Sequence, residues 1–177
     1  NEDLKSSSSL NYEIGWRKST SNLTLEAIAY AISSENEILP YELEQFPGKN
    51  FYQNVGSTSR YGLELNSQLS FEGGRINLSY TLSKNKFEDF IIDNNNLADN
   101  LIPGIPSQML DLDLIFKLSR GRSLIISNRF IGERYADNAN ETLISSYNLL
   151  NIKYSKEIFS NSEIFLGVNN AFNQEYF

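Results

Sequence analysis

The stretch that decides the fold runs from Gly62 to Ser83 and reads GLELNSQLSFEGGRINLSYTLS. Apolar and polar side chains alternate on both sides of Glu72-Gly73-Gly74, and strict alternation with a period of two is typical of β-strands. The two glycines supply a turn in which a positive φ is tolerated. We therefore interpret the stretch as a β-hairpin.

The same alternation recurs along the chain and predicts about eight long strands in total. No segment of ten or more residues shows a convincing helical period, so the sequence predicts an all-β chain. The other strands are expected at about Leu10–Lys18, Leu23–Ile38, Leu110–Leu118, Ser123–Tyr135, Ser145–Glu157 and Glu163–Phe172.

The connections between these strands alternate strictly between short and long. In an antiparallel up-and-down meander, this alternation puts every short turn at one end and every long loop at the other. That layout is typical of a transmembrane β-barrel, whereas a soluble sandwich mixes its loop lengths at both ends. The short turns lie near Ser19–Asn22, Glu72–Gly74, Ser119–Arg122 and Phe159–Ser162, and the long loops at about Leu39–Arg60, Glu88–Ser107 and Ala136–Ser145.

Strand length and aromatic placement favour the membrane as well. A barrel strand crosses a bilayer in about 9–11 tilted residues, whereas strands of soluble proteins average about 5–6 residues. Aromatic residues near the strand ends fit the girdles that barrels place at both membrane interfaces. These residues are Tyr61, Phe71, Phe87, Phe90, Tyr135, Tyr154 and Phe172.

The composition excludes several other classes of protein. A net charge of −7 argues against a nucleic-acid partner, which needs clustered Lys and Arg. The chain has no cysteine and no histidine, which removes thiolate chemistry, the usual general base and the commonest metal ligand. Asp111 and Asp113 share the polar face of one strand, where they fit a barrel's lumen wall better than an acid–base pair. We therefore expect no enzyme, no metal site and no cofactor.

Residues 166–177 (LGVNNAFNQEYF) and residues 1–17 (NEDLKSSSSLNYEIGWR) resemble segments of one family, the TonB-dependent outer-membrane receptors. Residues 166–177, LGVNNAFNQEYF, closely resemble the segment VxNLFNxxY found near the C-terminus of these receptors. Asn1–Lys5 followed by Leu10–Arg17 is similar to the segment NPxLKPE…NYELGWK, with Ser6-Ser7 in place of its Pro-Glu. Several weaker matches lie between them in the family's order.

The resemblance implies a fold and a function. The fold is an open segment of a transmembrane barrel of about 22 strands, with residues 1–177 as a partial barrel that lacks the plug domain and the final strand. The function is active transport across the outer membrane of a bacterium. The solute is a ferric siderophore in the first place, with haem and cobalamin as alternatives. The implied partners are the TonB complex, reached through the missing N-terminal plug region, the receptor's own plug, and outer-membrane lipid and lipopolysaccharide.

Five residues are candidate ligand contacts. Tyr41, Phe46, Phe51 and Tyr52 in the first long loop could stack on a siderophore or another planar ligand, although packing in a girdle or within the loop is the commoner role of such aromatic residues. Arg134 is expected at the outer rim, in contact with ligand or lipopolysaccharide, or in a structural ion pair.

Two other interpretations stay open on the sequence alone. A complete eight-stranded barrel with an anchoring or adhesive role is one, since about eight strands can close on themselves. A soluble all-β binding module is the other.

Overall fold

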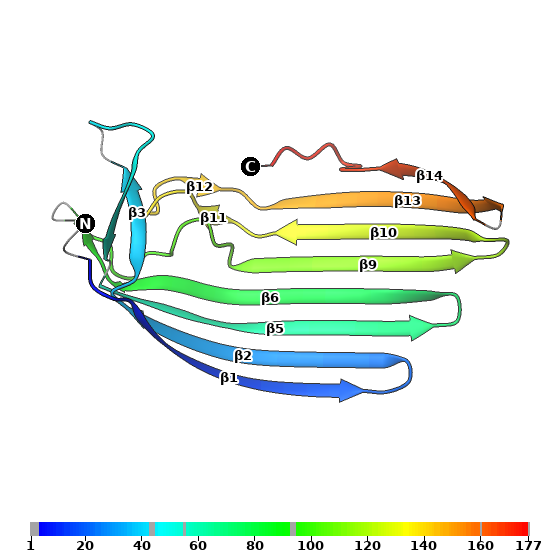
Figure 1. Cartoon of the computed structure of the whole chain (residues 1–177), viewed down its shortest axis with the longest axis horizontal. Coiled ribbons are helices and arrows are strands. Elements are labelled where there is room, and N and C mark those ends of the chain that lie inside the picture. Colours follow the sequence, from blue (N-terminus) through cyan, green and yellow to red (C-terminus); the bar gives the residue numbers. More distant parts are fainter. Residues whose placement is uncertain (1–3, 43–44, 55, 93–94, 160, 177) are drawn as a thin grey trace.

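The computed structural model describes residues 4–42, 45–54, 56–92, 95–159 and 161–176. Eight long strands form one antiparallel sheet in which each strand pairs with the next long strand along the chain (Figure 1). The predicted all-β meander is confirmed. The strands are β1 (Ser8–Ser19), β2 (Leu23–Glu35), β5 (Ser57–Phe71), β6 (Gly74–Asp89), β9 (Gln108–Leu118), β10 (Arg122–Ile131), β13 (Tyr147–Phe159) and β14 (Ser162–Val168).

The sheet is open within the described residues. β1 and β14 are its two edges, and each pairs with a neighbour on one side only. The interpretation as a closed eight-stranded barrel is therefore wrong, because closure would pair β1 with β14.

Short and long connections alternate as the sequence predicts, and Figure 1 shows the long loops gathered at one end of the sheet. Each long connection also contains a short ribbon of two strands, which the sequence did not indicate. These ribbons are β3 (Ile38–Glu42) with β4 (Asn50–Asn54), β7 (Ile91–Ile92) with β8 (Asn95–Asn96), and β11 (Arg134–Tyr135) with β12 (Leu143–Ile144).

Left-handed residues explain where two strands end earlier than predicted. Asn36 has a φ of 52°, so β2 stops at Glu35 and Ile38 begins a new strand. Near the C-terminus, Asn170 and Asn173 both have a φ of 49°, and the chain turns after Val168 rather than continuing to Phe172. Asparagine tolerates this conformation better than most residues, because its short side chain bonds locally.

The strand register places most of the apolar residues of the eight long strands on one face, although a few, such as Ile28 and Ile115, lie on the other. Opposed residues in antiparallel strands share a face, so each row can be followed from strand to strand. We call this face the apolar belt. It contains the rows Trp16–Ala27–Leu65–Tyr80–Leu110–Phe130, Ile14–Ala29–Leu63–Leu82 and Leu23–Leu69–Ile76–Leu114–Ile126–Ile152–Val168.

The apolar belt is not covered by any other part of the described chain. Leu63 is 51% exposed, Leu65 45% and Trp16 56%. An apolar surface of this extent needs a partner or lipid to cover it. The described residues contain no helix long and apolar enough to cross a membrane.

The buried hydrophobic residues of the described chain lie at the loop end. Phe87, Phe90, Leu97 and Ile102 form this small core, with Leu39 and Ile92 packed against it. The Phe87 and Phe90 rings lie 4.8 Å apart between centroids. Their assignment to an aromatic girdle is therefore wrong: they hold the second long loop onto the end of β6. Tyr61 and Phe71, in contrast, lie exposed on the face of the apolar belt.

Candidate functional site

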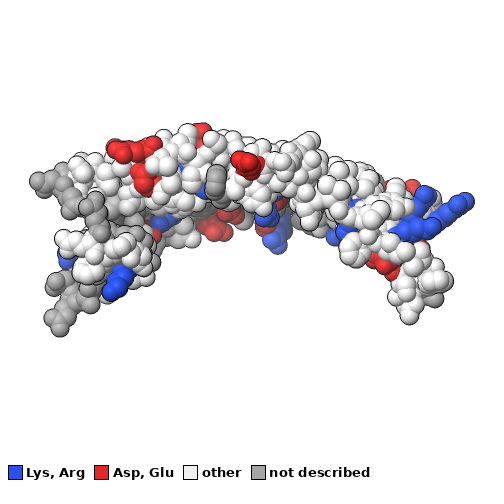
Figure 2. Space-filling model, turned by 90° about the horizontal axis from the view of Figure 1, so that it is seen from above, with Lys and Arg blue, Asp and Glu red and all other residues white. Residues whose placement is uncertain are grey.

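On the face opposite the apolar belt, polar side chains form ion pairs and hydrogen bonds with one another. One row runs Arg17–Glu26–Asn66–Ser79–Asp111–Arg129 across six strands. Arg17 and Glu26 form an ion pair, and so do Arg129 and Asp111, with 2.6 Å from Nε to the carboxylate. We call this face the polar face. Seen from above, the molecule is arched, and side chains of both charges lie in its hollow (Figure 2).

The two carboxylates singled out from the sequence have separate partners on β10. Asp111 accepts a hydrogen bond from Arg129, and Asp113 accepts one of 2.6 Å from the Ser127 hydroxyl. This cross-strand bonding suits the wall of a polar passage. Among the described residues, no group of three or more acidic side chains could hold a metal ion.

Two open grooves lie along the polar face. The one nearer the turns has a volume of about 500 Å³ and is lined by Arg17, Glu26 and their neighbours. The one nearer the loops has a volume of about 320 Å³. Its lining includes Asn11, Glu13, Tyr30, Arg60, Glu64 and Asn85.

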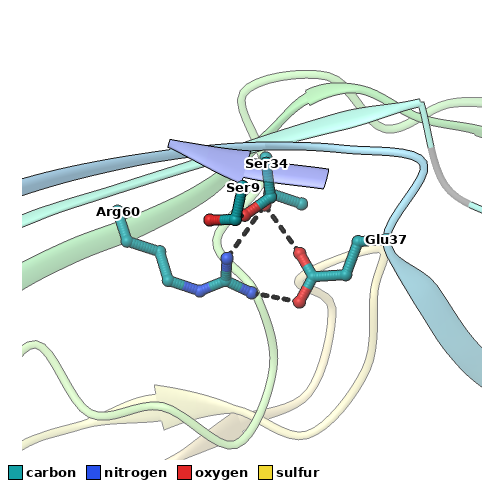
Figure 3. Close-up of polar contacts among 5 residues, drawn as sticks. Ser9, Ser34, Glu37 and Arg60 are labelled. Carbon is teal, nitrogen blue, oxygen red and sulfur yellow. Dashed lines mark hydrogen bonds and ion pairs between the residues drawn. The ribbon is translucent and has the colours of Figure 1, made fainter. Parts of the chain in front are cut away.

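A polar cluster at the loop end of this face ties the first long loop to the sheet (Figure 3). Glu37, just after β2, accepts hydrogen bonds from Arg60 Nη2 at 2.5 Å and from Thr58 Oγ1 at 2.7 Å. Arg60 Nη1 also donates to Thr58 Oγ1 at 3.0 Å. Beside them, the Ser34 hydroxyl bonds the Ser9 hydroxyl and joins β2 to β1.

Burial would raise the pKa of Glu37, but the bonds from Arg60 and Thr58 and the charge of Arg60 outweigh it. The net pKa lies below the 4.5 that is usual for glutamate. Glu37 is therefore ionised at neutral pH, and the ion pair with Arg60 is intact there.

Of the four predicted aromatic contacts, the three whose side chains the structure describes do not form one platform. Phe46 and Phe51 pack with ring centroids 5.8 Å apart, and the Lys49 ammonium lies 5.6 Å from the Phe46 ring. Tyr52 is 49% exposed and follows Phe51 directly in β4, so it points to the other side of the ribbon. Tyr41 pairs with Phe51 in the register, but its side chain lies outside the described residues.

Arg134 lies at the loop end, as the sequence predicts. It is half-buried in β11, and its guanidinium carbon lies 5.8 Å from the centre of the Tyr147 ring. The Tyr147 ring in turn lies 5.2 Å from the Tyr176 ring. Arg134 therefore takes part in a cation–π contact that the sequence did not predict.

The second and third long loops are joined by asparagines that sequence reasoning missed. The Asn140 amide accepts from the backbone N–H of Leu101 at 2.7 Å and donates to its carbonyl at 2.8 Å. Asn100 donates to the carbonyl of Asn138 at 2.9 Å. The sequence does not show which residues about forty positions apart will bond to each other. The one available signal was the high asparagine content of these loops, because asparagine side chains often bond to the backbone.

In the third loop, backbone N–H groups hold the carboxylate of an aspartate. The Asp137 carboxylate accepts N–H bonds from Glu141 at 3.1 Å and Thr142 at 2.7 Å. These bonds lower the pKa of Asp137 below its usual value. At the loop end, the second and third loops are thus joined by hydrogen bonds, and Leu39 of the first loop packs against the core that the second loop contributes to.

The sheet is an open meander with one apolar face and one polar face, and all its long loops lie at one end. This is the architecture of part of the wall of a transmembrane β-barrel. Comparison with known protein families shows which kind of β-barrel it is. The model of the TonB dependent receptor-like β-barrel matches residues 1–171. The chain belongs to this family.

Solved structures show the same fold. The siderophore receptor PiuA from Acinetobacter baumannii is 20% identical, with a TM-score of 0.78 over 96% of this chain and 25% of its own. The ferric yersiniabactin uptake receptor FyuA from Yersinia pestis is 20% identical, with a TM-score of 0.76 over 95% of this chain and 25% of its own. The copper transporter OprC is 15% identical, with a TM-score of 0.75 over 99% of this chain and 26% of its own.

The chain spans about a quarter of the length of these structures. At these identities the likeness shows the fold alone. No curated protein matches the chain.

Proposed function

We propose that the chain is part of an active transporter of the bacterial outer membrane, which imports a scarce solute with energy supplied by the TonB complex. The first candidate for the solute is a ferric siderophore, and haem and cobalamin are the alternatives. The family match over residues 1–171 carries this proposal. The names of similar structures support iron as the first candidate, although OprC is named as a copper transporter.

The two faces of the sheet support transport physically. An apolar belt that no described residue covers is suited to contact with lipid, and a polar face with bonded charges is suited to a lumen. The carboxylates and guanidinium groups on the polar face could also pair with a plug domain. We propose that such a plug fills the lumen and transmits the pull of TonB.

The loop end is the proposed site of ligand capture. Phe46 and Phe51 offer a packed aromatic pair with a cation beside it, and Tyr52 offers an exposed ring on the other side of the ribbon. Arg134 would contribute a positive charge at the third loop. Tyr41 is retained as a candidate because the register places it opposite Phe51.

Growth on defined solutes tests this function. The gene is deleted in the bacterium that carries it, and growth under iron limitation is measured with ferric siderophores, haem and, separately, cobalamin as the supplied solute. We expect the deletion strain to lose growth on one solute. The intact gene should restore this growth, but it should not do so in a strain that also lacks TonB. Unchanged uptake of every solute, or restoration without TonB, would contradict the proposal.

A further inference from the structure

The base of the β3–β4 ribbon is bonded through the side chain of Asn54, the last residue of β4. Its Oδ1 accepts a hydrogen bond of 2.8 Å from the backbone N–H of Lys5, and its Nδ2 donates to the Lys5 carbonyl at 3.0 Å. Nδ2 also donates to the carbonyl of Asn36 at 2.6 Å. Because an asparagine amide has two N–H donors and one carbonyl oxygen, all of these groups are used.

These bonds join two connections that lie 49 positions apart in the sequence. Lys5 belongs to the segment at 4–7, which leads into β1 at the loop end of the sheet, whereas Asn54 closes the ribbon of the first long loop (Figure 1). The amide bonds both the N–H and the carbonyl of Lys5, as a residue of a neighbouring strand does in a hydrogen-bonded antiparallel pair. The Asn54 side chain therefore attaches segment 4–7 to the ribbon.

The other strand of the ribbon has a different anchor. Asn36, with its φ of 52°, turns the chain out of β2. The next residue, Glu37, is bound to Arg60 on β5. β3 therefore begins at an anchor on the sheet, whereas β4 ends at an anchor on segment 4–7. Figure 1 shows β3 lying crosswise to the long strands at the loop end.

The two sides of the ribbon have different surroundings. Leu39 and Phe51 share one side, since the register pairs Leu39 with Gln53 and alternate residues of a strand share a face. Leu39 packs against the core of the loop end. Tyr52 and Asn54 share the other side, where the Tyr52 ring is half exposed. The direction of the ribbon therefore decides where the Tyr52 ring lies.

We propose that Asn54 is a positioning residue for solute capture. Its three bonds fix the direction in which the ribbon leaves the sheet, and so hold the Tyr52 and Phe46 rings in the arrangement that binds the solute. Only molecules in which these bonds are formed would bind, so the apparent affinity would fall with their fraction. The inference rests on the proposed capture of a solute at the loop end, and it adds segment 4–7 to that site.

Binding and uptake by the intact gene product in the deletion strain test this role. The probe is the radiolabelled solute that restores growth, chosen from ferric siderophores, haem and cobalamin. Binding to energy-depleted cells gives the Kd, and uptake by energised cells gives the maximal rate. Asn54→Ala is expected to raise the Kd about tenfold, as it would if a tenth of the molecules kept the competent arrangement. The maximal rate per folded receptor, counted by heat-dependent gel mobility, should stay unchanged.

Two substitutions at Lys5 provide the matched comparison. Lys5→Pro removes the N–H group that bonds Asn54 and should raise the Kd as well. Lys5→Ala keeps both backbone groups and should leave the Kd unchanged. Lys5→Pro combined with Asn54→Ala should add little to Asn54→Ala alone, because both substitutions break the same connection.

An unchanged Kd in Asn54→Ala, or equal effects of Lys5→Pro and Lys5→Ala, would overturn the proposal. So would a loss confined to the amount of folded receptor, which would mean a purely structural role. A parent that takes up a solute, with a Kd that Asn54→Ala does not change, refutes this inference alone. A parent that takes up none of the three kinds of solute refutes the proposed function, and this inference with it.

Discussion

Glu37 and Arg60 form an ion pair of 2.5 Å that connects the first residues of the long loop at 36–56 to the polar face of β5. Both side chains are largely buried, with 24% and 20% of their surface exposed. Thr58 bonds to both, so the pair has a third contact that fixes its geometry. The β3–β4 ribbon, which carries the proposed aromatic contacts, begins at the next residue after Glu37.

Removing this connection should loosen the ribbon. Glu37→Ala deletes two charge-assisted acceptor contacts, and bonds to charged groups are worth about 1.5–3 kcal/mol each at most. We expect amide hydrogen exchange in residues 38–54 to become about tenfold faster. Glu35→Ala is the control, because Glu35 is exposed at the end of β2. Equal acceleration in both variants would show that the ion pair does not hold the loop.

The same pair predicts a dependence on pH. The pKa of Glu37 in the folded state is below 4.5, so its contribution is complete above that pH and is lost as the pH falls through the lowered value. Exchange in residues 38–54 should therefore be constant from pH 8 to about pH 5, after correction for the intrinsic rate, and should rise below about pH 4. In Glu37→Gln this acid-induced rise should be absent. A rise in both proteins would assign the effect to other carboxylates.

The alternation from Gly62 to Ser83 was enough to predict the hairpin, and the motifs at both chain ends were enough to predict the family. Both depend on local sequence, because side-chain period and turn residues act within a few positions. The polar-face position of Asp111 and Asp113 was predicted in the same way. The partners Glu37 and Arg60 could not be predicted, since the loop conformation that brings them together is set by tertiary contacts. The asparagine bonds from Asn140 to Leu101 were missed for the same reason.

At position 62, packing against the neighbouring strands leaves room only for glycine. A Cβ at this position would lie 2.6 Å from the Leu82 carbonyl oxygen and 2.7 Å from the Tyr30 hydroxyl. The tyrosine tip can move, but the backbone carbonyl of the neighbouring strand cannot move without disturbing the ladder. We expect Gly62→Ala to cost about 1–3 kcal/mol, measured by urea unfolding of the folded protein in detergent.

Gly15→Ala is the matched control for this glycine. Gly15 also lies on the polar face, and a Cβ there would meet Ile28 at an ordinary contact of 3.7 Å. It should change the free energy of unfolding far less than Gly62→Ala. Similar losses in both variants would show that removal of glycine, and not the close approach to Leu82, is the cause.

The cross-link between the second and third loops gives another prediction. Asn140→Ala removes both bonds to Leu101 and also places alanine at a φ of 59°, which it adopts at a cost. Limited proteolysis should cut the loop at 95–107 several times faster than in the parent. Asn138→Ala should have little effect, because Asn138 accepts its bond through the backbone carbonyl. Equal cutting rates in all three proteins would mean that the loops are held by other contacts.

The assignment of the two faces can be tested with one pair of neighbouring residues. Leu65 lies in the middle of the apolar belt, between Ala27 and Tyr80, whereas Asn66 lies on the polar face between Glu26 and Ser79. Arginine on the lipid face near the bilayer midplane costs about 2–4 kcal/mol, while lumen positions tolerate charge. We expect Leu65→Arg in the intact gene product to reduce the amount of folded protein in outer membranes severalfold, and Asn66→Arg to leave it nearly unchanged, both measured by heat-dependent gel mobility of membrane fractions. The opposite order would place Leu65 in the lumen and refute the orientation on which the proposed transport depends. If both substitutions leave the amount of folded protein unchanged and the protein folds in plain buffer, a soluble all-β module would be favoured. In that case water would solvate a charge on either exposed face.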